Sequence, residues 1–265
     1  MCHHRPAIYG RCNEWITESS RVLKKSGSFY IFGFSYQLSK LINTFEDNGF
    51  KFKQDIVVWK GMKSAAGRIS KNLKMFPTTT EHIHFYFKDS KNYIRDLLQQ
   101  HRKRLDLSAK EINEYLGKAS NGGGTWSGIA GLKQKTLQEP TREDWHKLDK
   151  LFGGLPDYDD IVYKFNVPFG VTDVIDDIDF YDRNYRKEKF HPTQKPIPLI
   201  KRIIECGTNP NDIVLDLFGG SGSTAIACQE LNRRYIVSEL DSEMAKKSDE
   251  WLVQTKEKTK FFQQS

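Results

Sequence analysis

The sequence predicts an α/β protein in which helices cover both faces of a sheet. Two observations lead to this fold class. Strand and helix patterns alternate in both terminal parts of the chain, and a glycine-rich loop separates a buried strand from a helix near the carboxyl end. The middle of the chain lacks this alternation, so we expect a separate lobe there.

The amino-terminal part, residues 1–90, alternates amphipathic helices with apolar strands. The first helix carries its apolar residues on one face, and Ser26 and Gly27 follow it as a stop signal. The expected elements are helix 13–23, strand 28–32, helix 36–47, and strands 55–59 and 82–87. This order predicts the amino-terminal half of an α/β core.

The middle part, residues 91–180, is expected to form an inserted lobe. Residues 91–150 contain 12 basic and 8 acidic residues, whereas the next 30 contain 1 and 7. Ser108 and Glu111 have the spacing of a capping box, and Thr141 can cap a second helix. This change of charge and pattern predicts a lobe that is distinct from the core.

The carboxyl-terminal part, residues 181–265, returns to an α/β pattern. Its expected elements are strand 213–217, helix 221–231 and strand 235–238. A strand, a helix and a second strand in this order predict a βαβ unit, which forms the other half of the core.

The composition indicates a globular protein with a basic surface. The 265 residues carry a net charge of +7, which suits a polyanionic partner. We expect a cytoplasmic protein, because no apolar run approaches the roughly 20 residues that span a bilayer and the amino terminus lacks the pattern of a signal peptide. The four cysteines lack the spacing of a zinc site, so no metal is expected.

The strongest motif is the glycine-rich loop at residues 216–224, between a strand and a helix. Its glycines allow a sharp turn and let a ligand lie against the backbone. Glu239 closes the next strand, where a carboxylate can accept hydrogen bonds from both ribose hydroxyls. The loop alone leaves a dinucleotide open, because alanine, here Ala225, sometimes replaces the last glycine of the dinucleotide motif.

A second motif, His191-Pro192-Thr193-Gln194-Lys195-Pro196, precedes that loop. Its two prolines restrict the backbone, so that Thr193 and Lys195 are presented rigidly and could hold the carboxylate of an amino acid. By itself the hexapeptide could equally be an ordinary proline-bounded loop. Beside the glycine-rich loop, it favours a cofactor that contains an amino acid.

These motifs resemble those of bacterial restriction-modification DNA methyltransferases that modify exocyclic amino groups. The resemblance rests on residues 191–196, 214–224 and 233–239, and extends to Arg21-Val22-Leu23-Lys24 and Glu81-His82-Ile83. The order of the motifs resembles the subclass usually called beta. It implies a Rossmann-like, S-adenosylmethionine-dependent methyltransferase sheet with a middle recognition lobe, acting on a base flipped out of double-stranded DNA.

The resemblance also implies roles for individual residues. The expected cofactor-binding residues are Thr193, Lys195, Asp216, Phe218, Gly220, Ser221, Gly222 and Glu239. Within this set, Glu239 would hold the ribose, Thr193 and Lys195 would border the carboxylate, and the rest would line the methionine part. Leu217 and Ser223 depart from the family pattern, in which proline and threonine are common at these positions, and we expect cofactor binding to tolerate both.

The catalytic tetrapeptide of this family, an Asp, Ser or Asn followed by two prolines and an aromatic residue, is absent from the sequence. In the family it accepts hydrogen bonds from the amino group of the base and stacks on the flipped ring. The nearest string, residues 155–158, has one proline and the wrong order. We therefore expect a truncated or split form that lacks one central strand and needs an amino-terminal fragment in trans. Asp55 as a substitute acceptor is a weaker alternative.

A basic loop is expected to contact DNA phosphates. Residues 60–75 contain no acid and would emerge where the DNA cleft of the family opens. The candidates are Lys60, Lys63, Arg68, Lys71 and Lys74. A merely solvated loop is the alternative. In the lobe, Trp126 and residues 101–104 are candidates for base reading, with a core role for Trp126 equally open.

The leading functional interpretation is a site-specific adenine-N6 DNA methyltransferase, or its split remnant. The alternatives are a cytosine-N4 methyltransferase, a non-catalytic DNA-binding subunit of such an enzyme, and a dehydrogenase. The first residue of the absent tetrapeptide would separate adenine from cytosine. A dehydrogenase would bind NADH instead of S-adenosylmethionine.

Overall fold

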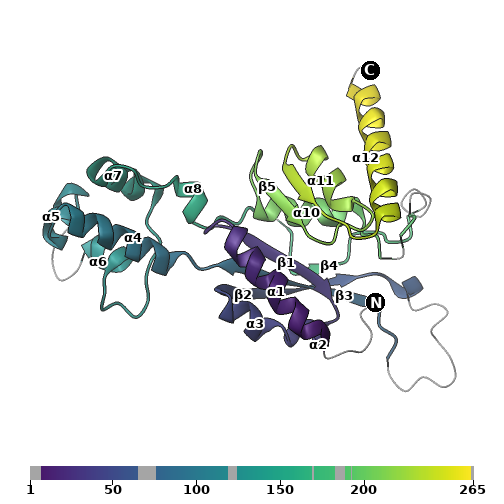
Figure 1. The fold of residues 1–265 in the computed structure, drawn as a ribbon, viewed down its shortest axis with the longest axis horizontal. Coiled ribbons are helices and arrows are strands. Elements are labelled where there is room, and N and C mark those ends of the chain that lie inside the picture. Colours follow the sequence, from purple (N-terminus) through teal and green to yellow (C-terminus); the bar gives the residue numbers. More distant parts are fainter. Residues whose placement is uncertain are drawn as a thin grey trace. The chain divides into compact units, whose positions relative to one another are not determined.

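The computed structural model of the chain describes residues 7–64, 76–118, 124–168, 170–182, 189–191 and 193–263. The chain forms two compact units. The first unit comprises Met1–Ile31, Tyr36–Gln54 and His84–Lys164, and the second comprises Phe32–Ser35, Asp55–Ile83 and Phe165–Ser265. Figure 1 shows their helices and strands, coloured along the sequence.

Four strands form one sheet in the order β1-β3-β2-β4. Their bounds are β1 Ser28–Gly33, β2 Phe50–Trp59, β3 Thr80–Lys88 and β4 Val174–Ile175. Strand β4 runs parallel to β2, with Val174 opposite Val57. The three strands predicted before residue 90 are confirmed, although β2 begins at Phe50 and not at Asp55. The short β4 was not predicted, because two residues are too few to show an alternating pattern.

An aromatic core lies beneath helices α1, Ala7–Val22, and α3, Ile42–Asp47. Ile16 of α1 and Phe45 of α3 are fully buried together with Phe50 and Tyr86 of the sheet. The rings of Phe45 and Tyr86 stack with their centroids 4.1 Å apart. The predicted amphipathic helix therefore buries the face that its apolar residues define.

The single helix expected at residues 36–47 is wrong, because two short helices, α2 Ser35–Ser39 and α3, occupy this segment. Between them the backbone N–H of Leu41 donates to the carbonyl of Leu38 at 2.9 Å, three residues back. Such a bond tightens the turn and interrupts the α-helical ladder. Leu38 and Phe45 nevertheless stay buried, so the apolar pattern is preserved across the break.

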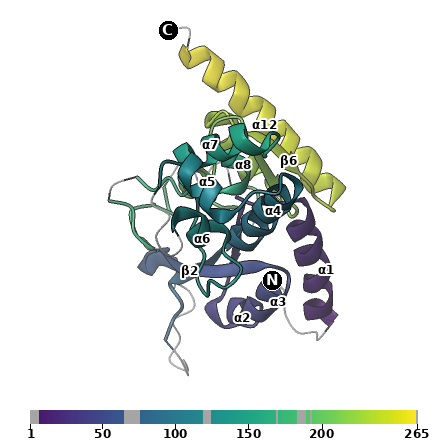
Figure 2. The same cartoon turned by 90° about the vertical axis from the view of Figure 1, so that its left-hand side faces the viewer.

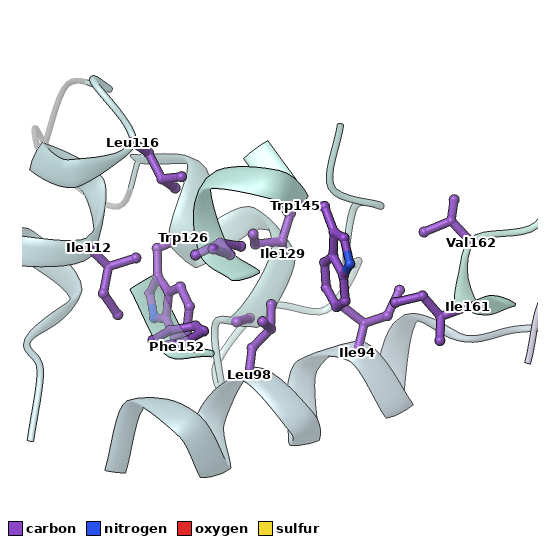
Figure 3. Close-up of a cluster of buried hydrophobic side chains, with 12 residues drawn as sticks. Ile94, Leu98, Ile112, Leu116, Trp126, Ile129, Trp145, Phe152, Ile161 and Val162 are labelled. Atoms are coloured by element: carbon purple, nitrogen blue, oxygen red, sulfur yellow. The ribbon is translucent and has the colours of Figure 1, made fainter. Parts of the chain in front are cut away.

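The lobe expected after residue 90 is helical and has its own core. Its helices are α4 Lys91–Arg104, α5 Ala109–Tyr115, α6 Gly124–Ala130, α7 Arg142–Phe152 and α8 Tyr158–Ile161, and all five are labelled in Figure 2. Trp126 and Trp145 are 1% and 2% exposed and lie among aliphatic side chains of α4 and α5 (Figure 3). The ring of Trp126 meets that of Phe152 edge to face at 6.1 Å.

The predicted helix caps of the lobe are confirmed. Ser108 Oγ accepts a hydrogen bond from the backbone N–H of Glu111 at 3.2 Å, and the Glu111 carboxylate accepts one from the Ser108 backbone at 2.7 Å. At the start of α7, Thr141 Oγ1 accepts from the Asp144 backbone at 3.1 Å. Both caps satisfy amide groups that a helix start leaves without a partner.

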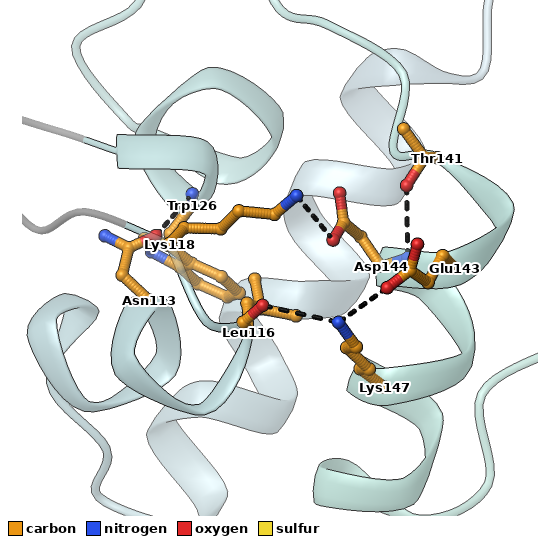
Figure 4. A network of polar contacts seen from close by, with 8 residues as sticks. All are labelled: Asn113, Leu116, Lys118, Trp126, Thr141, Glu143, Asp144 and Lys147. Carbon is orange, nitrogen blue, oxygen red and sulfur yellow. Dashed lines mark hydrogen bonds and ion pairs between the residues drawn. The ribbon is translucent and has the colours of Figure 1, made fainter.

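A polar network joins α5, α6 and α7 (Figure 4). Asn113 Oδ1 accepts a hydrogen bond from the Trp126 backbone at 2.9 Å, which fixes the first turn of α6 to α5. The ammonium of Lys118 lies 3.5 Å from the buried carboxylate of Asp144. Lys147 pairs with Glu143 at 2.7 Å on the surface of α7.

A second sheet consists of the parallel strands β5 Ile213–Asp216 and β6 Arg234–Val237. Its helices are α10 Ile197–Gly207, α11 Ser223–Glu230 and α12 Ser242–Gln263. Ile200 and Ile204 of α10 pack against Ala227 and Cys228 of α11, with Val214 of β5 beside them. The predicted βαβ unit is therefore confirmed. Among the described helices, none is both long and apolar enough to cross a membrane.

Strand β5 has β6 as its single strand neighbour within the described residues. The register puts Ile213, Leu215 and Ile236 on one face of this sheet, and all three are between 41% and 58% exposed. Unpaired strand edges and open apolar faces are costly in water.

Candidate functional site

The loop after β5 is held in shape by the carboxylate of Asp216, the last residue of that strand. One carboxylate oxygen accepts a hydrogen bond from the Phe218 backbone at 3.0 Å, and the other accepts one from Thr224 Oγ1 at 2.6 Å. Thr224 lies in the first turn of α11. Asp216 therefore ties the end of the strand to the start of the helix and closes the loop around its backbone.

The three glycines of this loop are needed for two different reasons. A Cβ on Gly219 would lie 2.2 Å from Val237 Cγ1 and 3.2 Å from the Ser238 carbonyl, so the close approach of β6 excludes a side chain. Gly220 and Gly222 have φ values of +52° and +82°, which favour glycine. At Gly220 the space for a Cβ is open, its nearest neighbour being 3.9 Å away, so a ligand can approach that backbone.

Glu239 is hydrogen-bonded to the same loop. Its carboxylate accepts hydrogen bonds from the backbone N–H of Gly220 at 2.8 Å and of Asp241 at 3.0 Å. The Asp241 N–H, with help from Gly220, lowers the pKa of the Glu239 carboxyl below its ordinary value. The group is therefore ionised at neutral pH, and each oxygen keeps a lone pair for a further donor.

The second motif lies against the glycine-rich loop. The Lys195 carbonyl accepts a hydrogen bond from Ser223 Oγ at 3.0 Å, and Ser223 Oγ lies 3.1 Å from Ser221 Oγ. Both serines are buried. The Thr193 hydroxyl is exposed and lies 3.0 Å from His191 Nδ1. Lys195 and the serines of the loop are thus linked at the end of β5, whereas the hydrogen bonds given for Thr193 are with His191.

The sequence assigned no role at this site to two further residues, although Glu81 is among those that carry the resemblance. Leu240 follows Glu239 directly and is 101% exposed, so an apolar side chain stands beside the candidate ribose acid, as Phe218 does at 69% exposed. Glu81 of β3 pairs its carboxylate with the ammonium of Lys195. Its position just past the end of a strand could have indicated Leu240 as a residue of the site. Nothing in the sequence pattern pairs two residues 114 positions apart.

Asp55 is engaged in a different contact. Its two carboxylate oxygens lie 3.1 and 3.0 Å from His82 Nδ1, across strands β2 and β3. The side chains are 33% and 20% exposed. The contact with His82 gives Asp55 a structural role in the sheet. It therefore argues against Asp55 as a substitute acceptor for the hydrogens of the base amino group.

Two of the five candidate DNA-contacting residues lie in the described part of the chain. The backbone N–H of Lys60 donates to the Thr79 carbonyl at 2.8 Å, where the loop leaves β2. Lys63 is exposed in the short turn Met62–Ser64, with its ammonium 5.9 Å from the centre of the Tyr181 ring. Arg68, Lys71 and Lys74 lie outside the described residues.

Three of the candidates for base reading in the lobe have structural roles. Trp126 belongs to the core of the lobe, so the alternative in which it packs inside is the one observed. Arg102 donates to the Leu107 carbonyl at 2.8 Å, and Arg104 donates to the Phe152 carbonyl. These two arginines hold the end of α4 to the following turn and to the end of α7.

Comparison with known proteins identifies the family of the chain. The family model described as DNA methylase, N6_N4_Mtase, matches residues 5–250. The chain therefore belongs to this family of DNA amino-methyltransferases, as its motifs indicated.

Curated relatives match a shorter stretch. The type II methyltransferase M1.MboII of Moraxella bovis is 51% identical over 53 residues, which are 20% of this chain and 20% of that protein. The DNA adenine methyltransferase YhdJ of Escherichia coli K12 is 50% identical over 56 residues, 21% of this chain and 19% of that protein. The matched stretches thus span about a fifth of the length of these relatives.

Solved structures with the same fold confirm the predicted architecture. The crystal structure of an M1.HpyAVI complex with S-adenosylmethionine covers 90% of this chain and 81% of that chain, with a TM-score of 0.53 and 21% identity. The PvuII DNA methyltransferase, described as cytosine-N4-specific, covers 91% of this chain and 70% of that chain, with a TM-score of 0.53 and 15% identity. The Rossmann-like α/β fold is therefore shared with DNA methyltransferases.

The contact between Gly219 and Val237 gives a first prediction. Gly219→Ala should lower the free energy of unfolding by about 1–3 kcal/mol through overpacking, because the β-branched Val237 cannot turn away. Adding Val237→Ala should cost less than the sum of the single changes, with a coupling of ~1 kcal/mol, as measured by urea denaturation. Gly220→Ala is the matched control, because its cost comes from positive φ and Val237→Ala should not relieve it. Strict additivity of Gly219→Ala and Val237→Ala would contradict the prediction.

Proposed function

We propose that the chain is part of a cytoplasmic, site-specific DNA methyltransferase that binds S-adenosylmethionine at the loop after β5 and methylates N6 of an adenine. The observation that carries this proposal is the hydrogen bond from the Gly220 backbone to the carboxylate of Glu239. It couples an open glycine backbone to an ionised acid at the ends of two parallel strands. This pairing of groups suits a nucleoside with hydroxyls to donate.

The residues of the site fit this cofactor. When bound, S-adenosylmethionine supplies a methyl group on a positively charged sulfur, and the chain supplies the surroundings. Glu239 accepts hydrogen bonds from the ribose hydroxyls with its remaining lone pairs. The exposed Phe218 and Leu240 offer apolar surface for a purine or thioether, and the segment 193–196 borders the amino-acid end.

Adenine N6 is favoured over cytosine N4 as the methylated atom. Support comes from the similarity to YhdJ, named as an adenine methyltransferase, at 50% identity over 56 residues. The cytosine-N4-specific PvuII enzyme shares the fold at 15% identity. Cytosine N4 remains the alternative activity, and a non-catalytic recognition subunit is the alternative role.

We further propose that the acceptor for the amino-group hydrogens comes from polypeptide outside residues 1–265, as an amino-terminal fragment in trans. The required tetrapeptide is absent from the sequence. The edge of β5 supports this, because within the described residues β5 pairs with β6 alone and a further strand would satisfy its remaining backbone groups. A strand added there would end beside the glycine-rich loop.

Binding of S-adenosylmethionine by the purified chain tests the cofactor assignment. Calorimetry should detect binding, and Glu239→Ala should weaken it by at least about 100-fold, because it removes a charged acceptor for two hydroxyls. NADH should not bind. Glu243→Ala, a change to an exposed acid on α12, is the matched control and should leave affinity unchanged. Binding of NADH with no response to S-adenosylmethionine would favour a dehydrogenase.

The basic loop should contribute phosphate contacts. Reversing two charges, with Lys63→Glu and Arg68→Glu, should weaken DNA binding and reduce the salt slope of log K by about 2, because each phosphate contact releases a counterion. Lys246→Glu with Lys247→Glu on α12 gives the same change in net charge at exposed positions and serves as the control. Equal affinities and slopes for the two pairs would mean that the loop is merely solvated.

Methyl transfer should require the proposed fragment. The chain alone should transfer no measurable tritiated methyl to DNA, since nothing in it matches the family's acceptor. Adding a polypeptide that carries a strand followed by the tetrapeptide should start turnover, and the same polypeptide with alanine as first residue of the tetrapeptide is the control. Normal turnover by the chain alone would overturn the need for a fragment.

A further inference from the structure

We propose that Glu81 is a positioning residue for the cofactor site, which fixes the segment 193–196 against the glycine-rich loop through its ion pair with Lys195. The inference rests on the proposed function, because it assigns to this contact the placement of the amino-acid end of S-adenosylmethionine. It also changes the role of Lys195: the ammonium holds the segment in place through its ion pair with Glu81, instead of binding the carboxylate of the cofactor.

The strand geometry separates Glu81 from its neighbour. Successive side chains of a strand point to opposite faces, so the side chains of Glu81 and His82 in β3 lie on opposite faces of the sheet and meet different neighbours. His82 pairs with Asp55 of the adjacent strand β2. Glu81 instead meets Lys195, a residue far along the chain, and belongs with the cofactor residues.

The Lys195 ammonium is held from two sides. It pairs with the Glu81 carboxylate, and it lies 5.1 Å from the centre of the Phe32 ring, within range of a cation–π contact. The two charged side chains are 22% and 18% exposed, so solvent screens their attraction only in part. With its charge matched in this way, the ammonium attracts a second carboxylate less strongly than an unpaired ammonium would.

The main chain of Lys195 carries the contact onward to the glycine-rich loop. Its carbonyl accepts a hydrogen bond from Ser223 Oγ at 3.0 Å, and Ser223 Oγ lies 3.1 Å from Ser221 Oγ. Ser221 stands between Gly220 and Gly222 in the sequence. A chain of three side-chain contacts therefore runs from β3 to the backbone that the cofactor would touch.

The cost of a partly buried ion pair supports a positioning role. Desolvation offsets much of the attraction of such a pair, so it contributes little net stability compared with apolar packing. The pair instead favours the arrangement in which its two charges meet, because other arrangements of the segment leave a partly buried charge without its match. We therefore expect the pair of Glu81 and Lys195 to affect the position of segment 193–196 more than the stability of the folded unit.

The first test needs no cofactor. Hydrogen–deuterium exchange of the full chain should show faster exchange at residues 193–196 and 219–224 in Glu81→Gln, because the ion pair with Lys195 is lost. Glu230→Gln is the matched control, since Glu230 forms a similar pair with Lys201 at 3.0 Å and has no contact with the glycine-rich loop among those described. Exchange in Glu81→Gln equal to that in the control would overturn the proposal.

The second test uses two ligands. Glu81→Gln should weaken S-adenosylmethionine binding about tenfold, while 5′-methylthioadenosine, which lacks the amino-acid end, should bind as it does to the unaltered chain. Lys195→Met should show the same loss, and the double variant should be no weaker than either single one. The swapped pair Glu81→Lys with Lys195→Glu should recover affinity.

The outcomes separate this inference from the proposed function. If the unaltered chain and its variants bind S-adenosylmethionine equally, the positioning role fails and the cofactor assignment stands. If the unaltered chain binds neither ligand, the cofactor assignment fails, and hydrogen exchange still decides whether Glu81 fixes the segment. Equal loss of both ligands in Glu81→Gln would indicate general damage to the unit and would overturn a role confined to the amino-acid end.

Discussion

The junction between the ends of β5 and β6 is the constraint on which the candidate site depends. The Gly219 N–H donates to the Ser238 carbonyl at 2.8 Å, and the Gly220 N–H donates to the Glu239 carboxylate at the same distance. These bonds require the two backbones to approach so closely that a side chain at position 219 is excluded. The positions of the Glu239 carboxylate and of the open Gly220 backbone therefore both depend on how closely the ends of β5 and β6 approach each other.

Local features of this protein were readable from the sequence because they depend on neighbouring residues. The capping box at Ser108, the strand 213–217 and the loop with its glycines each follow from spacing within a few positions. The same holds for Glu239, whose place after a short strand puts it at the edge of the sheet. The family could be named on these features, and the family model confirms it.

Features that depend on distant contacts could not be read in this way. The partner of Lys195 lies on β3, and no periodicity links the two. The burial of Trp126 depends on packing among helices α4 to α7, since an isolated tryptophan after a glycine run suits a core or a surface equally. The break near Leu41 arises from one tight turn inside an otherwise regular apolar pattern.

The core of the helical lobe is built entirely from residues between Ile94 and Val162. Its contacts are therefore close in sequence, and contacts of low sequence separation form quickly and with a small loss of chain entropy. Such a module can acquire new surface residues without repacking the strands on either side of it in the chain. Changes on the surface of the lobe and preservation of the sheet are then physically independent of each other.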